Sequence, residues 1–379
     1  MKQQTHNLLD IAESSQFQMT SGNDDLGFTF KLLGRGKTAG VQAVTLHCGT
    51  KKMTVIPTRG MGIWQAEHDN IRFGWDSPVK GPVHPMWVPV SEPSGIGWLD
   101  GFDEMMVRCG LASNGAPEFD DQGKLIWPLH GRVANLPATD LSVDMDESTK
   151  RIAIRGTVDE DRFHLQRLRL QTEISMQAES DEISITDTVT NLSDRPSSFQ
   201  MLYHNNFGTP LLESGSQFFA PIKKLVPRNE HAAAGLSQWN HYGPPDAGFA
   251  EQVYFMELSA GEDNHSTVLL TNANQSKGVS IRYDVTTLPC FSLWKNTVGL
   301  ADGYVTGLEP ATNFPNPRSF EEEHDRVVEL APGQSQTMSF QIGMLTNADS
   351  VAAAIRKVES LSNANPEIVS APPSNWCAP

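Results

Sequence analysis

The feature that most constrains the fold is a period-two alternation of apolar and polar residues along much of the chain. It is clearest in residues 168–176 and 183–189. Most such runs are bounded by Gly, Pro, Asn, Asp or Ser, which is typical of antiparallel strands with one buried face. Helical spacing is convincing only near Asp349 to Leu361, and the crossover helices of a parallel sheet are missing. We therefore predict an all-β chain with large antiparallel sheets and one or two short helices.

No linker or break in composition divides the 379 residues. We predict an N-terminal segment over residues 1–27, one domain over 28–362, and a Pro- and Ser-rich tail over 363–379 without regular structure. The stretch from Arg72 to Ala138 is rich in Gly, Pro and Trp and alternates little. Because long irregular segments inside a domain commonly carry function, we expect this stretch to fold over one face of the sheets.

Charge and hydropathy exclude several classes of partner. The net charge of −16 repels polyanions, so nucleic acid and anionic membranes are not expected as partners. No apolar run reaches the length of a membrane span, and the N-terminus lacks the apolar core of a secretion signal. The four cysteines lie far apart, which favours reduced thiols. These patterns predict a cytoplasmic protein, monomeric or homodimeric, that acts on a small molecule.

Common catalytic motifs are absent, among them His-Glu-x-x-His, Gly-x-Ser-x-Gly and a strand followed by Gly-x-Gly-x-x-Gly. The acidic run from Glu321 to Asp325 looks like a metal cluster. Neighbouring side chains of a strand point in opposite directions, however, so we expect a solvated edge there and no metal site. What remains is a set of residues in glycine- and aromatic-rich turns: Arg59, His130, Arg132, His204, Asn206, Trp294, Lys295 and Glu309.

Three of these turns resemble segments of the aldose 1-epimerases, or galactose mutarotases. Leu129-His130-Gly131 is similar to the Leu-His-Gly turn of that family, and the segment 203–207 to its histidine-containing segment. Gly307-Leu308-Glu309-Pro310 takes the place of its catalytic glutamate. A closer resemblance, over residues 28–345, is to a subfamily that carries a domain of unknown function. The segments shared with that subfamily include residues 58–61, 109–111, 130–132, 203–208, 288–294 and 307–310.

The resemblance implies a β-supersandwich with a carbohydrate site on its concave face and interconversion of the two anomers of a free aldose. Carried over by position, Glu309 is the base for the anomeric hydroxyl, His204 the acid for the ring oxygen, and His130 a second donor. We expect His204 and Glu309 to face each other across the sugar ring. Burial brings a glutamate toward neutral pKa and a histidine starts there, so the pair suits general acid–base catalysis. Neither a cofactor nor a metal is required.

The expected substrate-binding residues are Arg59, Arg108, Arg132, Asn206, Trp294 and Lys295, with the Trp294 ring stacking on the sugar. The aspartate that binds ring hydroxyls in mutarotases has no clear counterpart; Asp246 and Asp284 are the candidates. The additional arginines leave open an isomerase or lyase that uses the same His/Glu pair on an oxidised or acidic sugar. A non-catalytic sugar-binding protein is a further alternative. Purely structural roles for His204, Glu309 and His130 also stay open, as a buried histidine and as turn residues.

Overall fold

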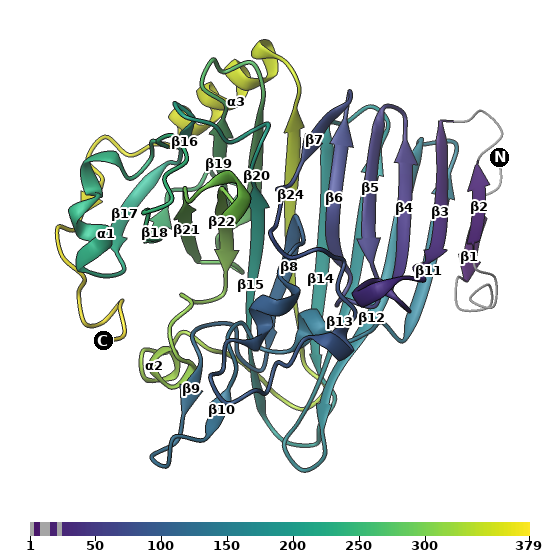
Figure 1. The fold of residues 1–379 in the computed structure, drawn as a ribbon, viewed down its shortest axis with the longest axis horizontal. Helices are drawn as coiled ribbons and strands as arrows, with labels where there is room; N and C mark the ends of the chain where they lie inside the picture. The colour runs from purple at the N-terminus through teal and green to yellow at the C-terminus, as the bar shows by residue number, and fades with distance from the viewer. Residues whose placement is uncertain (1–3, 8–15, 21–24) are drawn as a thin grey trace.

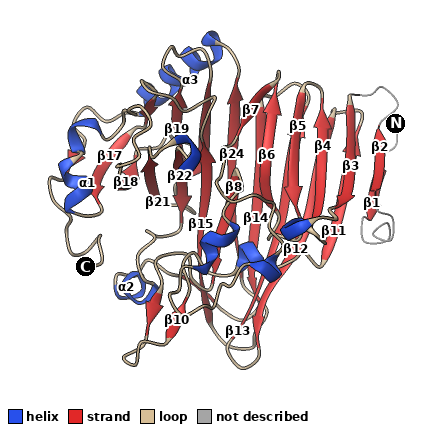
Figure 2. Ribbon diagram, viewed as in Figure 1, coloured by secondary structure: helices blue, strands red, loops and turns tan. Residues whose placement is uncertain are grey.

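The computed structural model describes residues 4–7, 16–20 and 25–379. Two large sheets with long, roughly aligned strands lie one behind the other, as Figure 1 shows. Figure 2 shows that strands dominate, that α1 and α3 lie at the margins, and that several short helical segments lie over the middle of the sheets. The predicted all-β architecture is confirmed.

The first sheet is antiparallel throughout its described strands. Its pairing aligns the apolar positions of the alternating runs, with Leu170 opposite Val189 and Ile174 opposite Ile185. In spatial order its strands are β1 (Gln4–Asn7), β11 (Asp140–Asp146), β12 (Arg151–Arg162), β13 (Gln166–Gln177), β14 (Glu182–Asn191), β24 (Ser335–Leu345), β20 (Gly278–Asp284), β19 (His265–Thr271) and β16 (Gln217–Phe219).

The second sheet contains the strands that carry the predicted site residues His204, Trp294 and Glu309. In spatial order it contains β2 (Gln16–Thr20), β3 (Leu26–Leu32), β4 (Gln42–Cys48), β5 (Lys51–Ile56), β6 (Gly62–His68), β8 (Met106–Leu111), β15 (Ser197–Phe207), β22 (Val305–Ala311), β21 (Cys290–Asn296), β18 (Gln252–Leu258), β17 (Ile222–Pro227) and β25 (Glu367–Ile368). Three further pairings involve β7 (Ile71–Phe73) with β6, β23 (Val328–Leu330) with β15, and the hairpin of β9 (Glu118–Phe119) and β10 (Leu125–Trp127).

Alternate residues of β15 face opposite sides of this sheet. Met201 and Tyr203 belong to the main hydrophobic core, whereas Leu202 belongs to a smaller cluster with Trp98 and Phe102. Strands β8 and β22 are buried along their whole length as well. Both faces are covered because the stretch 72–138 folds over the outer face, as predicted, and β8 itself lies within that stretch. A strand that is buried on both faces needs no polar alternation, so β8 was not expected from the sequence.

The predicted helix forms as α3 (Ala348–Leu361), and its buried Val351 and Val358 pack with residues of β19 and β24. The other helices are α1 (Glu230–Ala234), α2 (Arg318–Glu323), and the short 3-10 helices at residues 36–38, 85–87, 97–101, 133–135, 236–238 and 300–302. The run at residues 321–325 is not a strand edge, because Glu321 lies in α2, is fully buried and pairs with Arg326 at 2.7 Å. Glu322, Glu323 and Asp325 are exposed, as expected.

The two ends of the chain belong to the sheets. Strands β1 and β2 add an edge strand to each sheet, so the described parts of the N-terminal segment are structured. The tail is more regular than expected, since β25 pairs in parallel with β17, and Trp376 and Cys377 are buried. None of the described helices is long and apolar enough to cross a bilayer.

Candidate active site

A pocket of about 260 Å³ opens on the outer face of the second sheet, where β15, β22 and β21 lie side by side. It brings together three of the predicted residues, His130, His204 and Glu309, together with Trp294. Most of the remaining wall is apolar. The residues that line the pocket are Trp98, Leu99, Phe102, Ala116, Pro117, Leu129, His130, His204, Arg228, Glu251, Val253, Trp294, Glu309 and Pro315.

His204 is held by its neighbour on the same face of β15. Nδ1 of His204 lies 2.7 Å from Oδ1 of Asn206. The amide nitrogen of Asn206 donates to the carbonyl oxygens of Glu104 and His204, so Oδ1 is the atom that faces the ring. Nδ1 therefore carries a proton and donates it to Asn206, which leaves Nε2 of the neutral ring as an acceptor. Burial, and next the proximity of His130, lower the pKa of His204 to about 3.

Glu309 stands beside this nitrogen on the neighbouring strand. Its Oε1 is 3.2 Å from Nε2 of His204, and both side chains are almost completely buried. Burial raises the pKa of Glu309 well above its ordinary value. A buried carboxylate without a cation in contact is costly, so Glu309 favours its neutral, protonated form beside the neutral imidazole.

Gly307 makes this approach possible. A Cβ at position 307 would lie 2.9 Å from Cε1 of His204 and would overlap Oε1 of Glu309. Glycine is therefore required here to leave space for the two side chains, not for its backbone freedom. The glycine of the sequence motif thus lies within β22 and not in a turn, and it has a direct role in the geometry of the pair.

His130 is the third titratable residue of the site, next to His204 and Glu309. It has a left-handed backbone with φ of 56°, which is uncommon for a residue with a side chain and typical of functional sites. Its Nδ1 lies 2.9 Å from the backbone oxygen of Asn114, and because a carbonyl oxygen only accepts, Nδ1 is the protonated nitrogen. Burial lowers the pKa of His130 to about 4. Its ring centroid is 5.6 Å from that of His204.

The arrangement of the pair differs from the expectation. We expected His204 and Glu309 on opposite sides of a sugar ring, but a separation of 3.2 Å leaves no room for a ring between them. They are cross-strand neighbours on one wall of the pocket, because β15 and β22 pair with Asn206 opposite Gly307. Two groups placed side by side suit proton transfers to two adjacent atoms of a ligand.

Aromatic rings and one polar trio form the rest of the pocket. Phe102 and Trp294 pack edge-on against His204, with ring centroids at 5.1 and 5.4 Å. At the mouth, Nε1 of Trp294 donates to Oε2 of Glu251 at 2.7 Å. Oε1 of the same carboxylate lies 3.7 Å from Nη1 of Arg228. The trio places a donor and an acceptor next to each other at the entrance.

Arg59 and Arg108 were predicted to bind substrate, but the structure places both away from the pocket. Both are buried, and neither lines the pocket. Arg59 pairs with Glu104 at 2.7 Å and also bonds to Asn135 and to the Gly101 carbonyl. These internal bonds leave Arg59 no accessible atom for a ligand.

Arg108 is committed in the same way between the two sheets. Its guanidinium forms two bonds to Asp187, at 2.5 and 2.9 Å, and further bonds to Thr172 and to backbone oxygens. The expectation that Arg59 and Arg108 contact substrate is therefore corrected. Both are structural residues in this fold.

Three further expected contacts lie outside the pocket. Arg132 lines a separate surface depression with Ser91, to whose hydroxyl it donates at 3.4 Å. Lys295 is buried on the face opposite Trp294 and donates to the carbonyl oxygens of Gln238 and His241, and burial lowers its pKa to about 8. Asn206 is fully buried and positions His204, so it does not reach the pocket either.

The lining residues that were not predicted as site residues include two aromatic and two charged ones, Trp98, Phe102, Arg228 and Glu251. The two aromatic residues belong to the stretch 72–138, which was expected to cover a sheet face. Arg228 and Glu251 lie just after β17 and just before β18 and carry no motif. The candidates Asp246 and Asp284 do not line the pocket. Each accepts a hydrogen bond from the backbone two residues later, so Glu251 is the acidic residue at the entrance.

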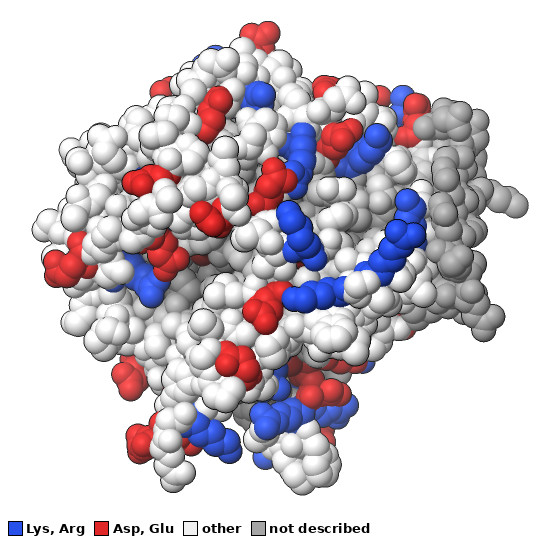
Figure 3. Space-filling model, viewed as in Figure 1, with Lys and Arg blue, Asp and Glu red and all other residues white. Residues whose placement is uncertain are grey.

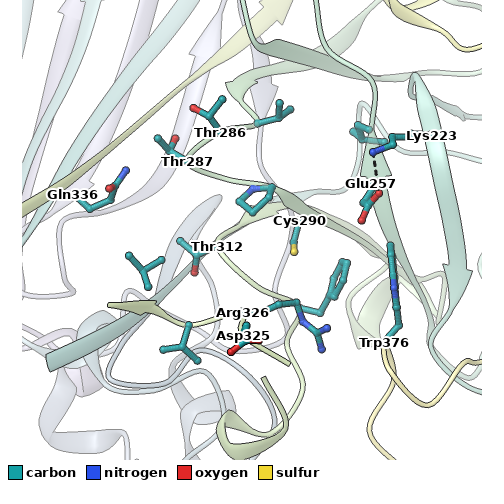
Figure 4. A pocket seen from close by; sticks show the side chains of 16 residues that line it. Lys223, Glu257, Thr286, Thr287, Cys290, Thr312, Asp325, Arg326, Gln336 and Trp376 are labelled. Atoms are coloured by element: carbon teal, nitrogen blue, oxygen red, sulfur yellow. Dashed lines mark ion pairs between the residues drawn. The ribbon is translucent and has the colours of Figure 1, made fainter. Parts of the chain in front are cut away.

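A larger pocket of about 590 Å³, shown in Figure 4, lies around Cys290, Thr312 and Trp376. Three of its four charged lining residues are paired, since Lys223 lies 3.4 Å from Glu257 and Arg326 is bound to Glu321. It contains no histidine beside a carboxylate, so the acid–base chemistry belongs to the smaller pocket. No cluster of three metal-binding side chains occurs among residues 4–7, 16–20 and 25–379. Figure 3 shows charged residues of both signs spread over one face of the molecule.

A comparison with family models identifies the family of the chain. The model of a family described as a domain of unknown function, DUF4432, matches residues 38–344. The chain belongs to the DUF4432 family. The predicted resemblance to a domain-of-unknown-function subfamily is thereby confirmed. No curated protein matches this DUF4432 chain.

Solved structures place the DUF4432 chain among mutarotase-like folds. A candidate aldose 1-epimerase from Klebsiella pneumoniae is 35% identical, with 98% of this chain and 99% of that chain covered and a TM-score of 0.93. A galactose mutarotase-like protein from Clostridium acetobutylicum has 12% identity, 86% and 100% coverage and a TM-score of 0.61. Galactose 1-epimerase from Lactobacillus acidophilus has 13% identity, 85% and 99% coverage and a TM-score of 0.57. The last two show the fold alone, and the predicted supersandwich is confirmed.

Proposed function

We propose that this DUF4432 protein is an isomerase of the aldose 1-epimerase type, which interconverts sugar anomers by opening and closing the ring. The observation that supports this most directly is the 3.2 Å approach of Nε2 of His204 to Oε1 of Glu309 in a pocket of about 260 Å³. The Klebsiella pneumoniae structure, described as a candidate aldose 1-epimerase, supports the same reaction class.

The side-by-side geometry suits this reaction. In an aldose the anomeric oxygen O1 and the ring oxygen O5 are both bonded to C1, so one pair of neighbouring side chains can reach both oxygens. One member of the pair takes the proton of O1–H while the other gives a proton to O5, and the C1–O5 bond breaks to leave an open-chain aldehyde. Rotation about C1–C2 followed by the reverse transfers closes the ring as the other anomer. Each group acts once as an acid and once as a base, so the pair ends with the protons it started with.

The protonation state of the pair is consistent with that cycle. Asn206 keeps a proton on Nδ1 of His204, so Nε2 is the nitrogen that exchanges protons with the sugar. With a proton on Glu309 and Nε2 of His204 free to accept one, the pair holds an acid and a base side by side. His130 presents its second ring nitrogen from the adjacent wall, where it serves as an acceptor for a sugar hydroxyl and not as the second donor expected from the sequence.

The remaining lining fits a sugar. Aromatic rings of Phe102 and Trp294 offer apolar faces for C–H groups. Arg228 and Glu251 place a donor beside an acceptor, which suits neighbouring hydroxyl groups. We also propose that the enzyme is cytoplasmic and works as a monomer or homodimer.

The two alternatives lose part of their support. The case for an acidic sugar rested on Arg59, Arg108 and Arg132, none of which lines the pocket. Among the arginines only Arg228 lines the pocket, and it lies next to Glu251, whose negative charge would repel an anionic sugar. A non-catalytic binding protein would be favoured by a Glu309 that points away from His204, which is the opposite of the observed geometry.

The test is anomer exchange measured by two-dimensional exchange NMR across a panel of neutral and acidic aldoses. We expect exchange well above the solvent rate for at least one aldose, and its loss in both Glu309→Ala and His204→Ala. His47→Asn, a substitution on β4, is the control that should keep full activity. Full-rate exchange in either alanine variant contradicts the assignment. Deuterium from solvent at a sugar carbon would identify the second isomerase or lyase, and binding without exchange would identify the binding protein.

A further inference from the structure

Behind the pocket, two asparagines form a closed pair. Nδ2 of Asn114 donates to Oδ1 of Asn313 at 2.9 Å, and Nδ2 of Asn313 donates to Oδ1 of Asn114 at the same distance. Both residues are fully buried, and neither lines the pocket. A reciprocal amide pair of this kind has one favourable geometry, because both donors and both acceptors must meet at once.

The asparagine pair is connected to His130 through Asn114. Its backbone oxygen accepts the Nδ1 proton of His130 at 2.9 Å, and the oxygen of the next residue, Gly115, accepts the His130 backbone N–H at 2.9 Å. The position and tautomer of the His130 ring therefore follow the position of the segment that carries Asn114.

Asn313 connects the pair to the strands of Glu309 and His204. It lies two residues after the end of β22, the strand that carries Glu309. Its Oδ1 also accepts from Oγ1 of Thr312 at 2.9 Å, and the same hydroxyl oxygen accepts the backbone N–H of Met201 on β15. Asn114 reaches β15 as well, since its backbone N–H donates to Oε1 of Gln200 at 3.2 Å. All three segments that supply the pocket's acid–base groups thus meet at this pair.

We propose that the amide pair of Asn114 and Asn313 is a positioning device that holds His130 in register with His204 and Glu309. The proposal rests on the proposed function for its kinetic consequence. Its structural part, the fixed tautomer of His130, does not depend on which reaction the pocket catalyses. The pair touches no substrate, so both asparagines are positioning residues and not catalytic ones.

The purely structural alternative has a matched control in the chain. Asn191 is also fully buried, and its amide donates to the backbone oxygens of Arg195, Leu330 and Ala331, away from the pocket. If buried asparagines contribute only stability, Asn313→Ala and Asn191→Ala should behave alike. If the pair positions His130, only Asn313→Ala should alter the ring.

The first measurement is histidine side-chain nitrogen NMR on the full chain. In the unaltered protein and in Asn191→Ala, His130 should be the Nδ1–H tautomer. In Asn313→Ala we expect a mixture of tautomers. The second measurement is anomer-exchange kinetics, where kcat should fall about 10- to 100-fold in Asn313→Ala with KM changed much less, because misplacement by about 1 Å costs up to about 100-fold.

A second variant guards against failure to fold. Asn114→Asp keeps the size of the side chain and the bond from Nδ2 of Asn313, but it sets two oxygens against each other in place of the other bond. It should show the same tautomer mixture. An unchanged Nδ1–H tautomer in both variants, with thermal stability lowered as in Asn191→Ala, would overturn the proposal. If no aldose is turned over by the unaltered protein, the proposed function fails, while the NMR result still decides the role of the pair.

Discussion

Nε2 of His204 and Oε1 of Glu309 are 3.2 Å apart although the two residues are distant in sequence. The register of β15 and β22 explains this, since Asn206 lies opposite Gly307 and Asn205 opposite Leu308. His204 and Glu309 therefore lie directly opposite each other on one face, and the rigid pairing of two central strands fixes their distance. A site on strands is held more precisely than one on loops.

Gly307→Ala tests whether that distance matters. The added Cβ would collide with Oε1 of Glu309 and lie 2.9 Å from the His204 ring, while the strand backbone itself tolerates alanine. We expect anomer exchange to fall about 10- to 100-fold with the fold retained, because the pair must separate. The control is Gly34→Ala, since no atom lies within 4 Å of a Cβ at that position. Polarimetry on both variants is the measurement, and an unimpaired Gly307→Ala enzyme would show that close approach is unnecessary.

Asn206→Asp should move the acid side of the pH–rate profile. The pKa of His204 is lowered to about 3, mainly by burial, so the neutral ring persists over most of the acidic range. A carboxylate in contact with Nδ1 favours the charged ring and raises its pKa, by about 1–3 units for a close pair. Activity that requires the neutral ring should then be lost at a pH about 1–3 units higher than in the unaltered enzyme.

The matched variant for this test is Asn206→Leu, which removes the hydrogen bond without adding charge. It should lower the rate at every pH and leave the position of the acid limb near that of the unaltered enzyme. Initial rates between pH 3 and pH 8, on the order of half a unit apart, separate the two effects. An acid limb that stays in place in Asn206→Asp would mean that His204 does not titrate in the catalytic step.

Glu309→Gln should stabilise the protein at neutral and alkaline pH. The folded-state pKa of Glu309 lies above its unfolded value because of burial, so the folded state keeps a proton that the unfolded state loses. Stability of the unaltered protein therefore falls as pH rises from the unfolded pKa toward the folded one. Glutamine does not titrate, so its contribution to stability does not change with pH. The difference in unfolding free energy between Glu309→Gln and the unaltered protein should widen by about 1.4 kcal/mol per pH unit at most.

Urea unfolding of both proteins at several pH values between about 4.5 and 8 measures this difference. Glu257→Gln, at a partly exposed position, is the matched control and should show no widening. A gap between Glu309→Gln and the unaltered protein that is constant or that narrows with rising pH would contradict a protonated Glu309.

Much of the architecture could be predicted from the sequence, and so could the pairing of His204 with Glu309. Period-two alternation identified β13 and β14, and helical spacing identified α3. The same parity would have excluded one expected contact, because Trp294 and Lys295 are consecutive in a strand and face opposite sides. The tail could not be predicted in this way, since β25 is two residues long and depends on β17 for pairing.

The arginines show where sequence reasoning stops. A guanidinium in a motif is equally consistent with a ligand contact and with a buried ion pair, and the partner decides between them. For Arg108 a signal existed, because Asp187 occupies an apolar position of an alternating run and a buried carboxylate needs a cation. For Arg228 and Glu251 no local pattern exists. They meet only because β17 and β18 are neighbours in the sheet.

Arg59→Met should therefore affect stability and not substrate affinity. Removal of the guanidinium leaves Glu104 buried without its partner, which typically costs about 3–5 kcal/mol. By contrast, Lys52→Ala breaks an exposed pair with Glu67 and should cost less than about 1 kcal/mol. Urea unfolding gives both free energies, and KM for the accepted aldose is measured on the folded fraction. A fully stable Arg59→Met protein with a strongly raised KM would return Arg59 to the set of substrate-binding residues.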